Sequence, residues 1–193
     1  PDPTTEALVT QPVQAAVAAL AANVLAMSEV PLDGRRSNVR RVETNVGNLA
    51  ADALLWQARQ LAVAQGLPPP QVALQNGGGI RNDSIIAAGN VSELNTFQIL
   101  PFSNFVTVLP SVPRVELKAV LENACSRVEF SDGRFAQVAG LRYTYDRSGA
   151  PGVGPSAVTG SRVRDVVLDD GTVIVQDGSV IRGPGVTIAT IDF

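Results

Sequence analysis

Three consecutive glycines, Gly77–Gly79, follow a short apolar segment and constrain how the chain folds around them. That segment, Val72–Leu74, is typical of the end of a buried strand. Glycine takes positive φ without steric cost and lets other groups approach its backbone closely. We therefore expect a buried strand that ends in a glycine loop, at the edge where open α/β sheets commonly bind ligands.

The residues around the glycines indicate what the loop can bind. Asn76 precedes the run, and Ile80 and Arg81 follow it. Successive exposed N–H groups can form a concavity for an anion, and the guanidinium of Arg81 suits phosphate or carboxylate. The run matches neither a Walker loop nor the dinucleotide motif G-x-G-x-x-G. The alternative is a tight turn beside a solvated arginine, and the motif alone favours neither.

The composition limits the classes of function. The 193 residues carry a net charge of −3, which argues against binding a nucleic acid polymer, because that needs a basic face. No run of about 18 apolar residues occurs, so we expect no membrane span. Histidine is absent, and with it the commonest general base and metal ligand. We expect this chain to hold a ligand and to carry no metal, cofactor or catalytic residue itself.

The length allows one domain with an arm, and we expect an arm, residues 1–31, followed by one domain, residues 32–193. A helix is expected over Pro12–Met27, connecting to something upstream. Thr44 or Asn45 can cap a second helix that runs to about Gln65. The apolar face predicted for this second helix is Val46, Leu49, Ala50, Ala53 and Leu54.

Further along the chain, strands and helices alternate irregularly. A short helix is expected after Ser92, and an amphipathic helix over Arg114–Val128, which includes the single cysteine, Cys125. Strands are expected over Phe105–Leu109, Phe135–Val138, Leu141–Tyr145, Val163–Leu168, Thr172–Val175 and Val186–Ile191. Because helices precede mixed strands, the pattern favours an α+β fold.

Several short blocks occur in an order that is informative as a whole. They are Leu32–Arg36 with Val39-Arg40, Glu43–Leu49 with Asp52-Ala53, Asn76–Arg81, Leu100–Asn104, Gly140–Arg142 with Asp146, and Ile191–Phe193. Together they resemble the C-terminal substrate-binding domain of the family of 5'-nucleotidases, UDP-sugar hydrolases and 2',3'-cyclic-nucleotide phosphodiesterases. The resemblance covers the chain from about Leu32 to Phe193. It implies a layered α/β/β/α-type domain with mixed sheets.

The resemblance also implies a division of labour between two domains. In this family an upstream metallophosphoesterase domain binds two divalent metal ions, and the C-terminal domain holds the nucleotide or nucleoside. Members are extracellular or periplasmic. This chain is therefore expected to be the substrate-binding half of a phosphoric ester hydrolase.

The resemblance carries over residue by residue. Arg36, Arg40 and Arg81 correspond to arginines that hold the polar and anionic groups of the ligand. Asn76, in the loop that also contains Gly78, corresponds to a nucleoside contact, and Asn104 to a nearby polar contact. Phe102 and Phe193 correspond to two phenylalanines that sandwich the base.

Each of these residues also has a plainer interpretation. Phe102 can be a core residue, Arg36 and Arg40 surface charges, and Asn76 a brace for the glycine turn. In the family a Gly-Gly-Asp-Gly stretch follows the second phenylalanine and binds ribose, whereas this sequence ends at Phe193. We therefore expect weaker nucleoside binding by this chain alone.

The alternatives for function also stay open. The chain can be a binding or dimerisation module without a catalytic partner. The same fold can serve UDP-sugars, cyclic nucleotides or non-nucleotide esters.

Overall fold

The computed structural model describes residues 2–154 and 159–192. Its centre is a four-stranded mixed sheet with the strand order β6-β12-β3-β7, in which β12 runs parallel to β3 and the other pairs are antiparallel. The bounds are Val72–Asn76 for β3, Val106–Val112 for β6, Ala136–Ala139 for β7 and Val186–Ile191 for β12. The buried strand expected before the glycine loop is thus confirmed as β3.

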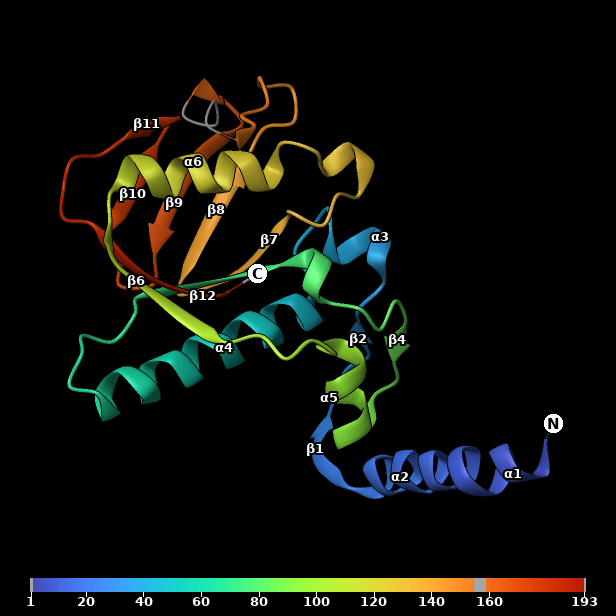
Figure 1. Cartoon of the computed structure of the whole chain (residues 1–193). Coiled ribbons are helices and arrows are strands. Elements are labelled where there is room, and N and C mark those ends of the chain that lie inside the picture. Colours follow the sequence, from blue (N-terminus) through green and yellow to red (C-terminus); the bar gives the residue numbers. More distant parts are fainter. Residues whose placement is uncertain (1, 155–158, 193) are drawn as a thin grey trace.

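Helix α4, Asn45–Ala64, covers one face of this sheet (Figure 1). Thr44 caps it, because the Thr44 hydroxyl accepts a hydrogen bond from the N–H of Gly47 at 3.0 Å. The predicted apolar face was partly wrong, since Leu49 and Ala53 are exposed. Small side chains let the helix approach the sheet closely, and this alanine-rich side is buried: Ala51, Leu54, Leu55 and Ala58 of the helix pack on Ala73, Ala139 and Ala189 of the strands.

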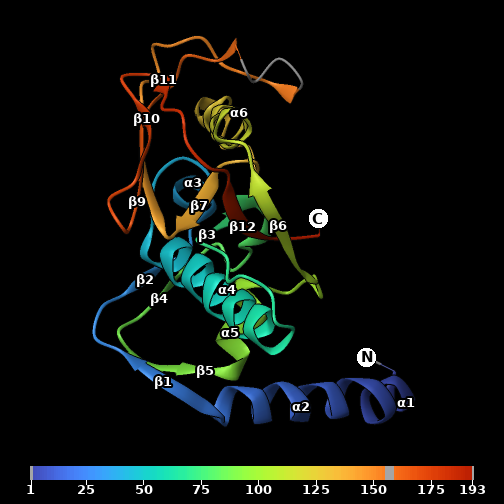
Figure 2. The same cartoon turned by 90° about the vertical axis from the view of Figure 1, so that its left-hand side faces the viewer.

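The opposite face is covered by α6, Arg114–Cys125, and a second sheet with the order β11-β10-β9-β8 (Figures 1 and 2). The strands are Leu141–Tyr145 for β8, Val163–Leu168 for β9, Val173–Gln176 for β10 and Ser179–Val180 for β11. Leu117, Leu121 and Cys125 of α6 pack in one buried cluster with residues of both sheets. The helix ends three residues earlier than predicted, and a 3-10 turn, Val128–Phe130, follows. The α+β class with mixed sheets is confirmed.

The N-terminal arm differs from the prediction. The helical part comprises α1, Pro3–Thr5, a π-helical turn, Glu6–Thr10, and α2, Gln11–Ala22. The helix was expected to continue to Met27, but it ends at Ala22, and Val24–Ser28 forms strand β1, which pairs with β5, Gly89–Ser92. Both views show α1 and α2 extending away from the sheets (Figures 1 and 2). Within residues 2–154 and 159–192, no helix combines the length and apolarity needed to cross a bilayer.

Short elements surround the glycine loop. Strand β2, Leu32–Asp33, pairs with β4, Ile85–Ile86, and leads into α3, Arg36–Val39. Helix α5, Glu93–Ile99, begins after Ser92 as predicted, where the Asn95 side chain accepts a hydrogen bond from the Ser92 N–H at 2.9 Å. Buried side chains from these elements pack around Ile80. These buried side chains fix the glycine loop between α3, α5 and the end of β3.

Candidate ligand-binding site

Of the three arginines predicted as ligand contacts, Arg36 and Arg81 lie close enough to act on the charge of Arg40. Arg36 is the first residue of α3, Arg40 follows that helix directly, and Arg81 follows the glycine loop. Burial lowers the pKa of Arg40, and the positive charges of Arg36 and Arg81 lower it further. The carboxylates of Asp132 and Asp83 oppose part of this effect. An anionic group placed among the three would relieve this repulsion.

Arg40 is the most constrained of the three. Its side chain is only 7% exposed, and its Nε has no hydrogen-bond partner among the described residues. A buried polar group without a partner is costly, so Arg40 occupies an unfavourable electrostatic setting in the ligand-free domain. The interpretation of Arg40 as a surface charge is wrong, because the residue is buried. Arg36, in contrast, is exposed.

Phe102 and Arg81 form one wall of a cavity. The guanidinium carbon of Arg81 lies 5.4 Å from the centre of the Phe102 ring. The ring is 54% exposed, so Phe102 does not fill the core. The cavity has a volume of about 270 Å³ and is lined by Gly78, Gly79, Arg81, Phe102, Asn104 and Ile191. Four of the residues predicted from the sequence therefore line one hollow, next to the arginine cluster.

The glycine loop takes a conformation that was not expected. Gly77–Gly79 form a 3-10 turn, and none of the three glycines has positive φ. The N–H groups of Gly77 and Gly78 donate to the carbonyl oxygens of Phe135 and Gly133, both at 2.7 Å. The prediction of an anion-binding concavity of successive free N–H groups was thus wrong, because these donors already complete the fold.

Close approach explains why glycine occupies this turn. A Cβ on Gly77 would lie 2.2 Å from the carbonyl oxygen of Val39, the residue before Arg40. Gly77 therefore lets the chain that carries Arg40 lie directly against the end of β3. The glycines contribute to the site because they leave room for close packing, and not because their backbone N–H groups bind a ligand.

The loop that contains Phe102 is attached to the end of β12. Asp192 Oδ1 accepts hydrogen bonds from Phe105 N at 2.9 Å and from Asn104 Nδ2 at 3.4 Å. The Asp192 N–H donates in return to the Phe105 carbonyl oxygen at 3.2 Å. The sequence did not indicate this role of Asp192, because nothing in the local pattern reveals a contact across 87 residues. Phe193 lies outside the described residues, and its predicted role as a second stacking wall stays a prediction.

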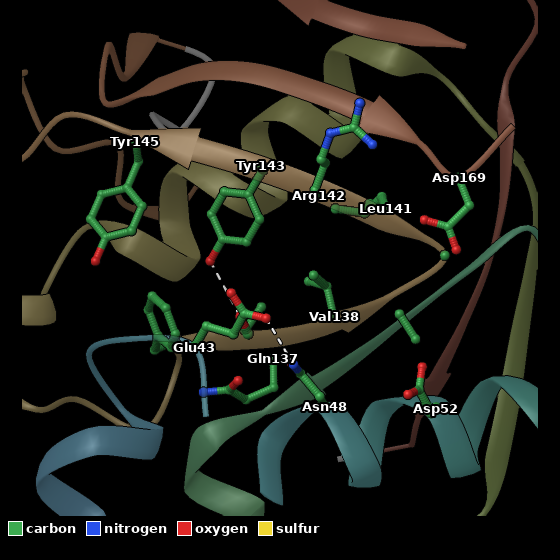
Figure 3. Close-up of a pocket in the computed structure, with 14 residues that line it drawn as sticks. Glu43, Asn48, Asp52, Gln137, Val138, Leu141, Arg142, Tyr143, Tyr145 and Asp169 are labelled. Carbon is green, nitrogen blue, oxygen red and sulfur yellow. Dashed lines mark hydrogen bonds between the residues drawn. The ribbon is translucent and has the colours of Figure 1, made fainter. Parts of the chain in front are cut away.

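A second hollow, of about 300 Å³, opens beside β7 and β8 (Figure 3). It contains none of the residues predicted as ligand contacts. Glu43 accepts a hydrogen bond from Asn48 Nδ2 at 2.7 Å, and the Tyr143 hydroxyl donates to the Ala136 carbonyl oxygen at 3.2 Å. These contacts brace the start of α4 and the two strands. No group of three or more His, Cys, Asp or Glu side chains that could hold a metal ion occurs in the described part of the chain.

Comparison with known proteins identifies the family. A family profile described as "5'-nucleotidase, C-terminal domain" matches residues 21–179. The chain belongs to the 5'-nucleotidase C-terminal domain family. The resemblance inferred from the sequence blocks is thereby confirmed. The arginine cluster and the cavity beside Phe102 are accordingly features of a 5'-nucleotidase C-terminal domain.

Individual relatives support the same family. The trifunctional nucleotide phosphoesterase protein YfkN of Bacillus subtilis is 38% identical over 125 residues, which are 65% of this chain and 8% of that protein. Human 5'-nucleotidase is 31% identical over 124 residues, covering 64% of this chain and 21% of the human protein.

A solved structure shows the same fold. The crystal structure of a 5'-nucleotidase precursor from Thermus thermophilus superposes with a TM-score of 0.72 at 35% identity, over 97% of this chain and 32% of the other. This chain thus spans about a third or less of the length of the proteins that it matches.

Proposed function

We propose that this domain binds the nucleoside or nucleotide substrate of a 5'-nucleotidase-type metallophosphoesterase. The observation that carries the proposal is the buried, unpartnered Nε of Arg40 beside Arg36 and Arg81, next to the exposed ring of Phe102. A nucleotide has the two matching parts, an anionic phosphate and a flat base.

The two parts of the site act through different forces. Stacking of a base on an aromatic ring contributes about 1–3 kcal/mol and tolerates different bases. Charge-assisted hydrogen bonds from arginines are stronger than neutral ones and hold the anionic end in register. Together they fix the orientation of the substrate, which is how a domain without catalytic residues contributes to a rate.

The hydrolytic step belongs to another part of the proposed enzyme. This chain has no histidine, and its described residues form no metal-binding group. We propose that two divalent metal ions in an upstream metallophosphoesterase domain activate the water that attacks the phosphate ester. An extracellular or periplasmic location is part of the same proposal. The matched region is a minor part of each relative, which is consistent with a further domain.

An NMR titration of this chain with adenosine, AMP and UDP-glucose tests the proposal. We expect saturable shifts of the backbone signals around Arg81 and Phe102, with AMP binding more tightly than adenosine because of its phosphate. The chain alone should show no phosphatase activity with Mn²⁺, Mg²⁺ or Zn²⁺. Absence of shifts with all three ligands would contradict the binding role, and concentration-dependent self-association without ligand shifts would favour a dimerisation module.

A further inference from the structure

Gln75 is a buried amide that lies directly under the candidate site. It is the last residue but one of β3 and only 2% exposed. Its Nε2 lies 3.2 Å from the main-chain oxygen of Asn76 and 3.1 Å from the side-chain oxygen of the same residue. The Gln75 amide group therefore holds both the backbone and the side chain of one predicted ligand contact.

These two contacts fix the orientation of the Asn76 amide by hydrogen-bond chemistry alone. A main-chain carbonyl oxygen only accepts, so the Gln75 atom that faces it must be the NH₂ group. The Asn76 atom that faces the same NH₂ group must then be the oxygen. The Asn76 NH₂ group, with its two donors, is left on the side away from Gln75.

The glycines accommodate this arrangement. A Cβ on Gly79 would lie 2.5 Å from Gln75 Nε2 and 3.2 Å from Asn76 Oδ1, so a glycine there leaves room for the pair of amides. The Asn76 Nδ2 atom lies 3.3 Å from the place of a Cβ on Gly78, and Gly78 lines the cavity beside Phe102. The free donor is thus next to a wall of the cavity.

We propose that Gln75 is a positioning residue, which turns the N–H donors of Asn76 toward the ligand. The site then selects a ligand that places a hydrogen-bond acceptor at this point, such as a ring nitrogen of a purine. This inference rests on the proposed function, because it names the recognition chemistry of the same site. A ligand that lacks the acceptor leaves a donor of Asn76 unpaired, which costs affinity.

Adenosine and its 1-, 3- and 7-deaza analogues test the proposal, since each analogue replaces one ring nitrogen by C–H. The wild-type chain should bind one analogue at least about fivefold more weakly than adenosine. Gln75→Met removes the donor without burying a charge and should abolish this discrimination. The matched control is Gln71→Met, because Gln71 precedes the same strand and accepts a hydrogen bond from Thr187 N, away from the site. This variant should keep the discrimination.

Gln75→Glu provides a second, opposite test. An ionised carboxylate only accepts, so at a pH high enough to ionise the buried carboxyl it should attract the Asn76 NH₂ group and present the Asn76 oxygen to the ligand. Adenosine should then bind about tenfold more weakly to this variant than to the wild type. The analogue that the wild type discriminates against should lose less affinity than adenosine does. Equal binding of adenosine and all three analogues by the wild type would overturn the proposal. Unchanged discrimination in Gln75→Met would also overturn it.

A measurement without ligand separates this proposal from the proposed function. In the ¹⁵N-labelled wild-type chain, the side-chain NH₂ group of Asn76 should be ordered, with a high heteronuclear NOE. A freely rotating amide would contradict the role of Gln75, even if the variants fail to fold. If adenosine does not bind while the Asn76 amide is ordered, the proposed nucleoside binding is wrong, and only the hold of Gln75 on the Asn76 amide stands.

Discussion

Gln75 and Gln137 lie directly opposite each other on the paired strands β3 and β7, and each is only 2% exposed. Directly opposed residues of an antiparallel pair project to the same face of the sheet. Gln75 holds Asn76 by the hydrogen bonds described above. Gln137 Nε2 donates to the carbonyl oxygens of Val39 at 3.0 Å and Val42 at 2.8 Å.

The Gln137 amide also accepts a hydrogen bond, from Thr44 N at 3.3 Å. It therefore fixes the segment that contains Arg40 from both ends. Because neighbouring residues of one strand pair support Asn76 and Arg40, the spacing of these two predicted ligand contacts is set by the sheet and not by a surface loop.

Arg40→Met should make the ligand-free domain more stable and a weaker binder. The substitution removes a buried charge whose Nε is unpartnered among the described residues. Arg36 and Arg81 repel this charge more than Asp132 and Asp83 attract it. We expect a gain of about 1 kcal/mol in the free energy of unfolding, and loss of most of the thermal stabilisation by AMP. Differential scanning fluorimetry with and without AMP measures both effects. The control is Arg36→Met, which should leave the stability of the ligand-free domain nearly unchanged, because Arg36 is exposed. A lower stability of Arg40→Met than of the wild type would show that Arg40 has a structural partner.

Phe102→Ala should weaken nucleoside binding at least about fivefold, because base stacking contributes about 1–3 kcal/mol. Phe130 offers a matched control, since it is also exposed and lies under an arginine, with Arg127 5.2 Å from the ring centre. Calorimetric titration with adenosine and AMP should show normal affinity for Phe130→Ala. Equal affinities of the two variants would exclude Phe102 from the binding site.

Gly77→Ala should destabilise the domain by about 1–3 kcal/mol, since its Cβ would collide with the Val39 carbonyl oxygen. The collision should also displace Arg40 and weaken AMP binding. Gly66→Ala is the comparison, because Gly66 has a φ of +67° but a Cβ added there would meet no heavy atom within 4 Å. Urea unfolding should show a loss of about 1 kcal/mol for Gly66→Ala from backbone strain alone, with normal AMP affinity. Normal AMP affinity in Gly77→Ala would show that Val39 and Arg40 move independently.

Asp33 should contribute stability that depends on pH. Hydrogen bonds from the Arg35 side chain at 2.8 and 2.9 Å, together with one from Asn38, hold the pKa of Asp33 well below its ordinary value of 3.8. Because the folded-state pKa is depressed, the stabilisation is present above pH 3.8 and is lost as the pH falls through the folded-state value.

The difference in unfolding free energy between the wild type and Asp33→Asn should therefore be constant near neutral pH and shrink below pH 3.8. Urea titrations of both proteins at a series of pH values measure this difference. The contributions of other carboxylates are the same in both proteins and cancel. A difference that grows on acidification would have the wrong sign and would reject the assignment.

Local signals made part of the structure predictable. Thr44 and Ser92 are helix-capping residues at the positions where α4 and α5 begin, and Val72–Leu74 lies in the central strand as the apolar run indicates. The predicted residues Gly78, Arg81, Phe102 and Asn104 line one cavity. They could be predicted because several sequence blocks occur in the order that is typical of one family. The order identifies these residues, although each block alone is uninformative.

Non-local contacts explain what the sequence did not reveal. Val24–Ser28 has residues suited to either a helix or a strand, and only its pairing with Gly89–Ser92 decides for the strand. The donors of Gly77 and Gly78 were expected to be free, but Phe135 and Gly133, far along the chain, accept their hydrogen bonds. The roles of Gln75 and Gln137 depend equally on partners that local patterns do not indicate.

The position of β12 in the central sheet determines when the domain can fold during synthesis. Val186–Ile191 lies between β6 and β3, so the ribosome makes the middle of the sheet after both of its neighbours. Until these residues leave the exit tunnel, β3 and β6 lack the strand that joins them, and their apolar surfaces stay accessible to chaperones and proteases. The central sheet can therefore be completed only after this late segment has been made, and the contacts across β12 form late.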